Sequence, residues 1–385
     1  MSEPTGLAVR GVLGAMFLLA LSAAPLLAAP LPAHRSDAPR ATAGALAADV
    51  SGQPESARIP FAQRYQAVHR GGIVRAANSS ITCSAPKAPA TRECATARAG
   101  ADGVNSDFEM FYIDEDSDPN TYNSSRARLA VPKNSTVTYA RLYWGGNLLA
   151  GEQKPPEDNG RVLIAEEGGQ YQAVLADTRI AHRNADGMDA FQASADITPL
   201  VRRAGAGIYT VAQINVAMGH SDIGTWGGWT LVVAYENSGE PLRHLSLWDG
   251  FESLGAGRRT QDISLPGMRI PEKAAGHAGF VAYDGDRGQD GDTVRVRADG
   301  AEGLGLTDAA NPATDVMNST ITGPGAAITR RPDHANTLGY DSDVFDITPA
   351  LASGGTGLTF RFAGETAAVH GYGLGVLFVQ ADTRR

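Results

Sequence analysis

The sequence predicts an all-β protein built from two tandem β-sandwich or jelly-roll domains that are related by an internal repeat. Short apolar runs, several of them alternating with polar residues, recur along the chain, and many of its 45 glycines and 21 prolines fall in the turns between them. Sustained helical periodicity is scarce. The tetrad Asp-Ile-Thr-Pro occurs twice, beginning at Asp196 and at Asp346, and a period of 150 residues has the size of a domain rather than of a solenoid repeat.

The first half of the chain supplies most of the expected strands. The residue patterns predict strands at 72–83, 108–113, 125–132, 136–146, 161–165 and 171–176. The last two of these are expected to form a hairpin across the turn Glu-Glu-Gly-Gly at 166–169.

The stretch 196–251 organises the rest of the chain. Asp196 is expected to accept a hydrogen bond from a free backbone N–H where the turn begins, and Thr198 to cap a short helix that ends at Gly205 or Gly207. Strands are then predicted at 208–216, 226–236 and 242–251. The last two are expected to pair with each other in antiparallel fashion.

Glycine, proline and charged residues become frequent between residues 253 and 279, so a domain boundary is expected near residue 260. The predicted divisions are a signal peptide (1–29), a flexible leader (30–71), a first domain (72–260) and a second domain (261–385). Strands of the second half are predicted at 278–283, 293–297, 357–362 and 371–379.

The N-terminus carries a predicted export signal. Arg10 precedes a short apolar run, which ends in the small residues Ala28 and Ala29 as a signal-peptidase site requires. The run is short for a membrane span, although an uncleaved N-terminal anchor is the alternative. No membrane span is expected after cleavage. The formal charge of −9, without a run of lysine and arginine, argues against nucleic acid as a partner.

The two cysteines, Cys83 and Cys94, suit an exported protein. They enclose a short proline-containing segment and are expected to close it with a disulfide bond, which in the loop-entropy model contributes roughly 3 kcal/mol of stability. A metal site is a poorer interpretation, because two thiols at this spacing lack companion ligands.

Several ordered motifs carry a family resemblance. They are Thr82-Cys-Ser, Glu93-Cys-Ala-Thr-Ala-Arg-Ala-Gly, Tyr112-Ile-Asp-Glu-Asp-Ser-Asp-Pro, Ala140-Arg-Leu-Tyr-Trp-Gly-Gly, Gly228-Trp-Thr-Leu-Val-Val-Ala-Tyr and Tyr283-Asp-Gly-Asp-Arg-Gly. In this order they resemble the N-terminal module of large exported bacterial surface proteins, in which β-rich repeats often follow. The resemblance covers residues 72–380 and implies an all-β fold and a location at or beyond the cell surface. Because no such repeats follow here, free secretion or a periplasmic location is an equally open expectation.

Two acidic turns are candidate calcium sites. Each places oxygen donors at close spacing, a pattern that can wrap a hard cation. The first turn offers Asp114, Asp116, Asp118 and Asn120, and the second offers Asp284, Asp286, Asp290 and Asp292. Neither follows the EF-hand pattern, and the alternative is a solvated turn that merely ends a strand.

Three tryptophans are candidate ligand-binding residues. Trp144 and Trp226 each precede a Gly-Gly pair and Trp229 follows one, so their indole faces could stay open to stack on sugar rings. The alternative is ordinary core packing, because tryptophan buries a large apolar area on strands.

The leading functional hypothesis is an exported, non-catalytic β-sandwich protein that serves adhesion or envelope structure, with calcium as a stabilising ion and glycans or other envelope components as partners. A carbohydrate-binding module is the first alternative. A glycan- or amide-cleaving hydrolase of the paired jelly-roll kind is the second, and it requires two carboxyl groups facing one cleft at the seam between the domains.

Overall fold

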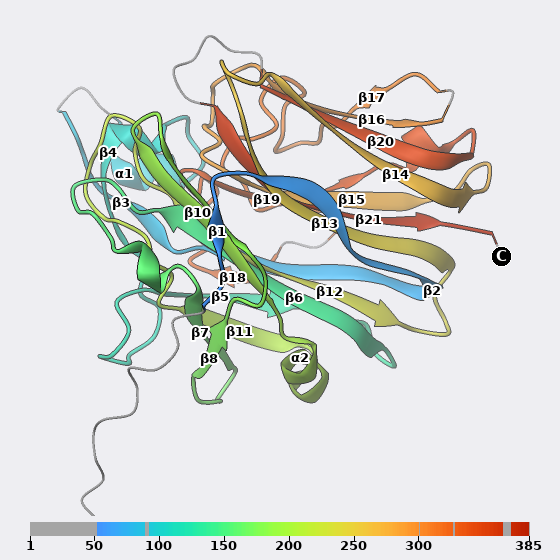
Figure 1. Cartoon of the computed structure of the whole chain (residues 1–385), viewed down its shortest axis with the longest axis horizontal. Helices are drawn as coiled ribbons and strands as arrows, with labels where there is room; N and C mark the ends of the chain where they lie inside the picture. Colours follow the sequence, from blue (N-terminus) through green and yellow to red (C-terminus); the bar gives the residue numbers. More distant parts are fainter. Residues whose placement is uncertain (1–51, 89–91, 300, 326–327, 365–370, 385) are drawn as a thin grey trace, which may run out of the picture. The chain divides into compact units, whose positions relative to one another are not determined.

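Strands make up most of the computed structural model, which describes residues 52–88, 92–299, 301–325, 328–364 and 371–384 (Figure 1). The predicted signal peptide and the first part of the predicted leader lie outside these residues. The segment Asp49–Arg385 forms one compact unit. Within the described residues, no helix is both long and apolar enough to cross a bilayer.

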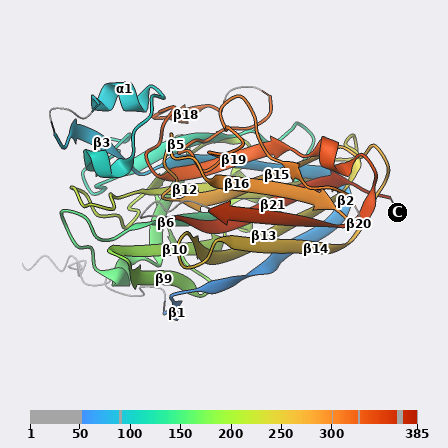
Figure 2. The same cartoon turned by 90° about the horizontal axis from the view of Figure 1, so that it is seen from above.

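A ten-stranded sheet runs through this unit and contains strands from both halves of the chain (Figures 1 and 2). In order across the sheet, its strands are β1 (Glu55–Ser56), β9 (Ile180–Ala185), β10 (Met188–Asp196), β6 (Thr136–Asn147), β12 (Gly227–Glu236), β2 (Ile59–Ser79), β13 (Leu242–Leu254), β21 (Tyr372–Asp382), β15 (Gly276–Tyr283) and β19 (Tyr340–Asp346).

A smaller sheet packs against each end of the large one. The first contains β18 (Arg330–Arg331), β5 (Ser124–Leu129), β11 (Gly207–Ala212), β7 (Arg161–Glu166) and β8 (Gln172–Leu175). The second contains β14 (Thr260–Ile270), β20 (Gly355–Gly364), β16 (Asp292–Ala298) and β17 (Leu304–Gly305). The remaining elements are the hairpin β3 (Ile81–Pro86) and β4 (Phe108–Tyr112), the helices α1 (Cys94–Arg98) and α2 (Thr198–Ala204), and the 3₁₀ turns η1 (Asn105–Asp107), η2 (Pro156–Asp158) and η3 (Thr348–Leu351).

The order of strands is repeated in the two halves. In the large sheet β2-β12-β6-β10 corresponds to β13-β21-β15-β19, and in the small sheets β5-β11-β7-β8 corresponds to β14-β20-β16-β17. Each set of eight has the two-sheet arrangement of a jelly roll. The two first strands, β2 and β13, pair antiparallel with each other and so fuse the two sets into one sheet.

The prediction of an all-β, jelly-roll fold is confirmed, whereas the division into two tandem domains is not confirmed. The expected boundary near residue 260 falls between β13 and β14, which the repeat assigns to the same half. A tight turn at Gly255–Arg258 leads from β13 into β14, and β14 and the start of β15 occupy most of the remaining stretch, so this region is built of strands and turns and is not a linker.

Two further predictions need correction. The predicted flexible leader, 30–71, contains β1 and most of β2, a strand of 21 residues whose first part is mostly half-exposed and therefore lacks a strong apolar pattern. The predicted pairing of 226–236 with 242–251 is also wrong, because β2 inserts between β12 and β13 and pairs with both. The predicted hairpin of β7 and β8 is confirmed.

The repeated tetrad fixes the same turn in both halves. Asp196 Oδ1 accepts the N–H of Thr198 at 2.8 Å, and Asp346 Oδ1 accepts the N–H of Thr348 at 2.9 Å. Thr198 does not cap α2 as predicted; its hydroxyl instead accepts the N–H of Ala140 in β6 at 2.9 Å. Gly205, with φ of 71°, ends the helix as expected.

The hydrophobic residues form one core inside each sandwich and a third core between the halves. The third core contains Tyr143 and Trp226 from the first half and Phe251, Tyr283 and Tyr340 from the second. The rings of Trp226 and Tyr283 lie 5.2 Å apart, centroid to centroid. The large sheet therefore curls at the β2–β13 pair so that its two halves face each other, and we call the space between them the junction.

Candidate functional site

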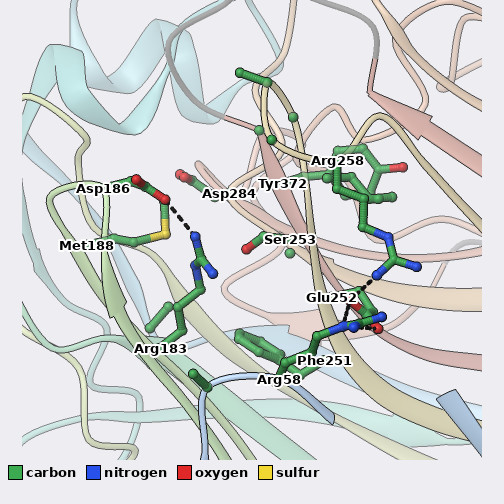
Figure 3. A pocket seen from close by; sticks show the side chains of 18 of the residues that line it. Arg58, Arg183, Asp186, Met188, Phe251, Glu252, Ser253, Arg258, Asp284 and Tyr372 are labelled. Carbon is green, nitrogen blue, oxygen red and sulfur yellow. Dashed lines mark hydrogen bonds and ion pairs between the residues drawn. The ribbon is translucent and has the colours of Figure 1, made fainter. Parts of the chain in front are cut away.

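A cavity with a volume of about 540 Å³ opens at one end of the junction (Figure 3). Residues from both halves line it: Arg183, Asp186 and Met188 come from the β9–β10 hairpin, whereas Glu252, Ser253 and Arg258 come from β13 and the turn after it. Trp226 and Phe251 supply buried apolar surface. We call this the junction cavity.

Three arginines and three carboxylic acids line the junction cavity, and two of the arginines share one of the acids. Glu252, whose side chain is only 3% exposed, accepts hydrogen bonds from Arg58 Nε at 2.7 Å and from an Arg258 guanidinium nitrogen at 2.9 Å. Both guanidinium groups remain partly exposed. Since two cations share one carboxylate, this wall carries one surplus positive charge.

A second ion pair lies on the opposite side of the cavity. Arg183 donates to Asp186 Oδ2 at 2.7 Å, and the Asp186 side chain is largely exposed. Figure 3 shows Ser253 and Asp284 between this pair and the Arg58–Glu252–Arg258 group. The cavity thus combines guanidinium groups, three carboxyl groups, a hydroxyl and an apolar floor. The arginines that share Glu252 are the part of this lining that suits an anionic group of a polar ligand.

Asp284 connects the cavity to a set of buried acids. Its backbone adopts φ of 63°, and its Oδ1 accepts a hydrogen bond from Asn105 Nδ2 at 3.0 Å. Its other carboxylate oxygen has no partner among the described residues. Burial raises the pKa of Asp284 well above the usual range for aspartate.

Six aspartates from three segments form what we call the buried acidic cluster, in which Asp286 and Asp292 are half-buried and the other four are buried. They are Asp284, Asp286 and Asp292 from the β15–β16 turn, Asp315 from the segment after β17, and Asp341 and Asp343 from β19. Burial and the neighbouring carboxylates raise the pKa of Asp292 to about 8 and that of Asp315 to about 6. The pKa of Asp341 is also raised by burial and by Asp343.

The structure places the predicted second acidic turn partly within this cluster. Asp284, Asp286 and Asp292 belong to it, whereas Asp290 is exposed and accepts the hydroxyl of Thr314 at 2.8 Å. In the described ranges, no three carboxylate, imidazole or thiol groups lie together as a ready-made metal centre. Calcium at this turn stays a prediction.

The first acidic turn satisfies its own donors and acceptors. Asp116 accepts hydrogen bonds from the hydroxyls of Thr121 and Tyr171, and Asp118 Oδ1 accepts from Asn120 at 2.7 Å. Asp114 Oδ1 accepts from Ser124 at 2.9 Å. These interactions account for the acidic residues as parts of a structured turn.

Sequence reasoning missed Asp315, Asp341 and Asp343. Asp341 and Asp343 occupy alternate positions of a strand that is buried on both faces, where an acidic residue is unusual. That conflict between residue type and burial was the available signal. The spatial approach of β19 to the β15–β16 turn, by contrast, depends on long-range pairing.

The predicted ligand-binding role finds no support at Trp144 and Trp229. Both are fully buried in the core of the first half, and their indole N–H groups donate to the Asn159 carbonyl at 2.8 Å and to Ser125 Oγ at 2.9 Å. Neither leaves a ring face open for stacking. Trp226 is also buried, but it lines the junction cavity.

The predicted disulfide is confirmed. Cys83 and Cys94 are bonded and tie α1 to β3. Arg98 donates to the carbonyl of Cys83 at 2.7 Å. The bond therefore holds a small satellite core against the β3–β4 hairpin.

The hydrolase alternative requires carboxyl groups at the seam, and the junction cavity contains Glu252, Asp186 and Asp284. Two arginines hold the Glu252 carboxylate, which favours a structural or binding role over proton transfer. A catalytic role remains an untested hypothesis.

No family model matches this chain. No curated protein matches it either. Among solved structures, it is similar to the major capsid protein P2 of bacteriophage PM2, with 12% identity, a TM-score of 0.21, and coverage of 70% of this chain and 96% of the capsid protein.

Two other solved structures are comparably distant. A protein of Sulfolobus turreted icosahedral virus has 8% identity and a TM-score of 0.20, with coverage of 67% and 86% of the two chains. Quercetin 2,3-dioxygenase from Acinetobacter baumannii has 9% identity and a TM-score of 0.18, with coverage of 69% and 75%. At these scores the likenesses carry no functional argument.

Proposed function

We propose that this chain is an exported, non-catalytic β-sandwich module of the bacterial surface or envelope that binds an acidic glycan in the junction cavity. One observation carries the proposal: Arg58 and Arg258 share the single buried carboxylate of Glu252 and leave a surplus positive charge at the cavity wall. The signal-like N-terminus and the resemblance to exported surface modules support the location.

The cavity suits such a ligand in size and chemistry. Its volume of about 540 Å³ lies within the range of sites that enclose a small molecule or a few sugar units. Guanidinium groups bind carboxylate or sulfate with two parallel hydrogen bonds. The partly exposed side chain of Met188 can pack against the carbon face of a pyranose ring.

Binding of charged and neutral oligosaccharides tests this proposal. We expect uronic-acid oligosaccharides to bind, and neutral oligosaccharides of the same length to bind at least about tenfold more weakly, because only the former can pair with the surplus arginine charge. The affinity should fall as salt rises, since part of the site is exposed. Isothermal titration calorimetry measures both effects.

Matched arginine variants locate the site. Arg258→Gln should weaken uronate binding at least about tenfold, whereas Arg361→Gln should not change it, because Arg361 pairs with Asp262 on the exposed surface of β20. Equal binding of neutral and acidic oligosaccharides, or an unchanged affinity of the Arg258 variant, would refute the proposal.

A further inference from the structure

We propose that the buried acidic cluster binds a calcium ion through Asp292, Asp315 and Asp341 together with the backbone carbonyl of Met317. Only Asp292 belongs to the acidic turn that is evident in the sequence. The site is independent of glycan binding in the junction cavity, so either proposal can fail without the other.

Backbone pairing brings the first two ligands together. Asp292 begins β16 and forms an isolated parallel bridge with Asp315, in which the N–H of Val316 donates to the carbonyl of Asp292 at 3.3 Å. The N–H of Gly291 donates to the carbonyl of Thr314 at 2.6 Å. The bridge places the backbones of Asp292 and Asp315 side by side, and like charges on these two side chains repel each other in the absence of a cation.

Asp341 contributes the third carboxylate from β19. It is fully buried, and its Oδ1 accepts the N–H of Thr320 at 3.0 Å. Its Oδ2 and the Oδ1 of Asp315 have no partner among the described residues, although Asp315 is only 5% exposed. An unpaired buried carboxylate is costly, so these two oxygens favour binding of a cation or of a proton.

A glycine allows a neutral ligand to approach the same point. A methyl group on Gly285 would lie 2.4 Å from Asp341 Oδ2 and 2.3 Å from the Met317 carbonyl oxygen. The Asp341 carboxylate and the Met317 carbonyl therefore both lie next to Gly285 in the β15–β16 turn. Calcium commonly combines carboxylate and carbonyl oxygens, whereas zinc and copper favour nitrogen and sulfur ligands that this cluster lacks.

The nearby arginines donate their hydrogen bonds to backbone carbonyls and not to the proposed carboxylate ligands. Arg287 donates to the carbonyls of Gly100 and Ala335, and Arg75 donates to those of Thr322 and Ser342 next to Asp343. The three proposed carboxylate ligands surround the β15–β16 turn, but in the described residues they are too far apart to contact one ion at the same time. We therefore expect calcium to draw the three segments together and to stiffen them.

Calcium titration after chelation tests the site. The full-length protein is treated with EDTA, dialysed, and titrated with CaCl₂ or MgCl₂ while heat of binding and melting temperature are measured. We expect calcium to bind and to raise the melting temperature, because a ligand that binds only the folded state stabilises it, and magnesium to have a smaller effect because it tolerates irregular geometry poorly.

Asparagine variants assign the ligands. Asp341→Asn should weaken calcium binding at least about tenfold and abolish the rise in melting temperature, whereas Asp118→Asn in the first acidic turn should leave both unchanged. Asp292→Asn should reproduce the effect if the Asp341 variant fails to fold. Loss of calcium binding in the Asp118 variant alone would overturn the proposal. Absence of calcium binding at about 10 mM would also overturn it, and would show that protons, not calcium, neutralise the cluster.

Discussion

At the scale of single residues, the partners of a buried polar atom define its role. The indole N–H groups of Trp144 and Trp229 donate inside the core, so these side chains stabilise a sandwich and do not face solvent. The sequence could predict that tryptophan favours strands, but not which acceptor lies beneath each ring. The disulfide was predictable because Cys83 and Cys94 are the two cysteines of a chain whose N-terminal pattern predicts export.

His182 gives a pH-dependent prediction. Its Nδ1 lies 2.7 Å from Glu55 Oε2 and its Nε2 lies 2.6 Å from Asp189 Oδ1. Burial opposes protonation, but the hydrogen bonds to the two carboxylates outweigh it and raise the pKa of His182. Because the raised pKa belongs to the folded state, this stabilisation is full below the ordinary histidine pKa and is lost as pH rises through the folded value.

Urea unfolding at pH 5.5 and pH 8.5 measures this effect. His182→Gln should reduce the free energy of unfolding more at pH 5.5 than at pH 8.5. The lower value is about one pH unit below the ordinary histidine pKa, so His182 is charged there. His69→Gln, which alters a half-buried histidine of β2, serves as the control. An equal loss at both pH values would exclude a charged His182 in the folded protein.

At the scale of elements, the Asp-Ile-Thr-Pro turn was the most predictable feature. In both halves the aspartate accepts the N–H of the threonine two residues later. The isoleucine between them, Ile197 or Ile347, donates its N–H to a neighbouring strand. Local hydrogen bonding of this kind depends on residues close in sequence. The pairing of β13 with β2 was not predictable, because its partner lies more than 160 residues away and local patterns do not choose among apolar strands.

The equivalence of the two turns can be measured. Asp196→Ala and Asp346→Ala should each lower the free energy of unfolding by about 1 kcal/mol, because each removes one acceptor from a turn with the same geometry. Glu167→Ala, in the exposed β7–β8 turn, should have almost no effect. Chemical denaturation of the three variants gives the comparison; a negligible effect of either aspartate substitution would show that the repeat is not equivalent in energy.

At the scale of the whole molecule, the junction cavity lies where the two halves meet, whereas the proposed calcium ligands all belong to the second half. Asp284 borders the junction cavity, and Asp341 comes from the edge strand of the large sheet. The acidic turn was visible in the sequence, but its partners were not, because they depend on how the sheet curls. Composition predicted the fold class, whereas the position of the sites required the long-range strand order.

The central claim is that the repeated halves share one sheet and enclose the functional region between them. Differential scanning calorimetry of the full-length protein tests it most directly, because residues joined by β2–β13 pairing and by the third core should unfold together. We expect a single transition in which the calorimetric and van't Hoff enthalpies agree. Two resolved transitions, each assignable to one half of the chain, would contradict the claim.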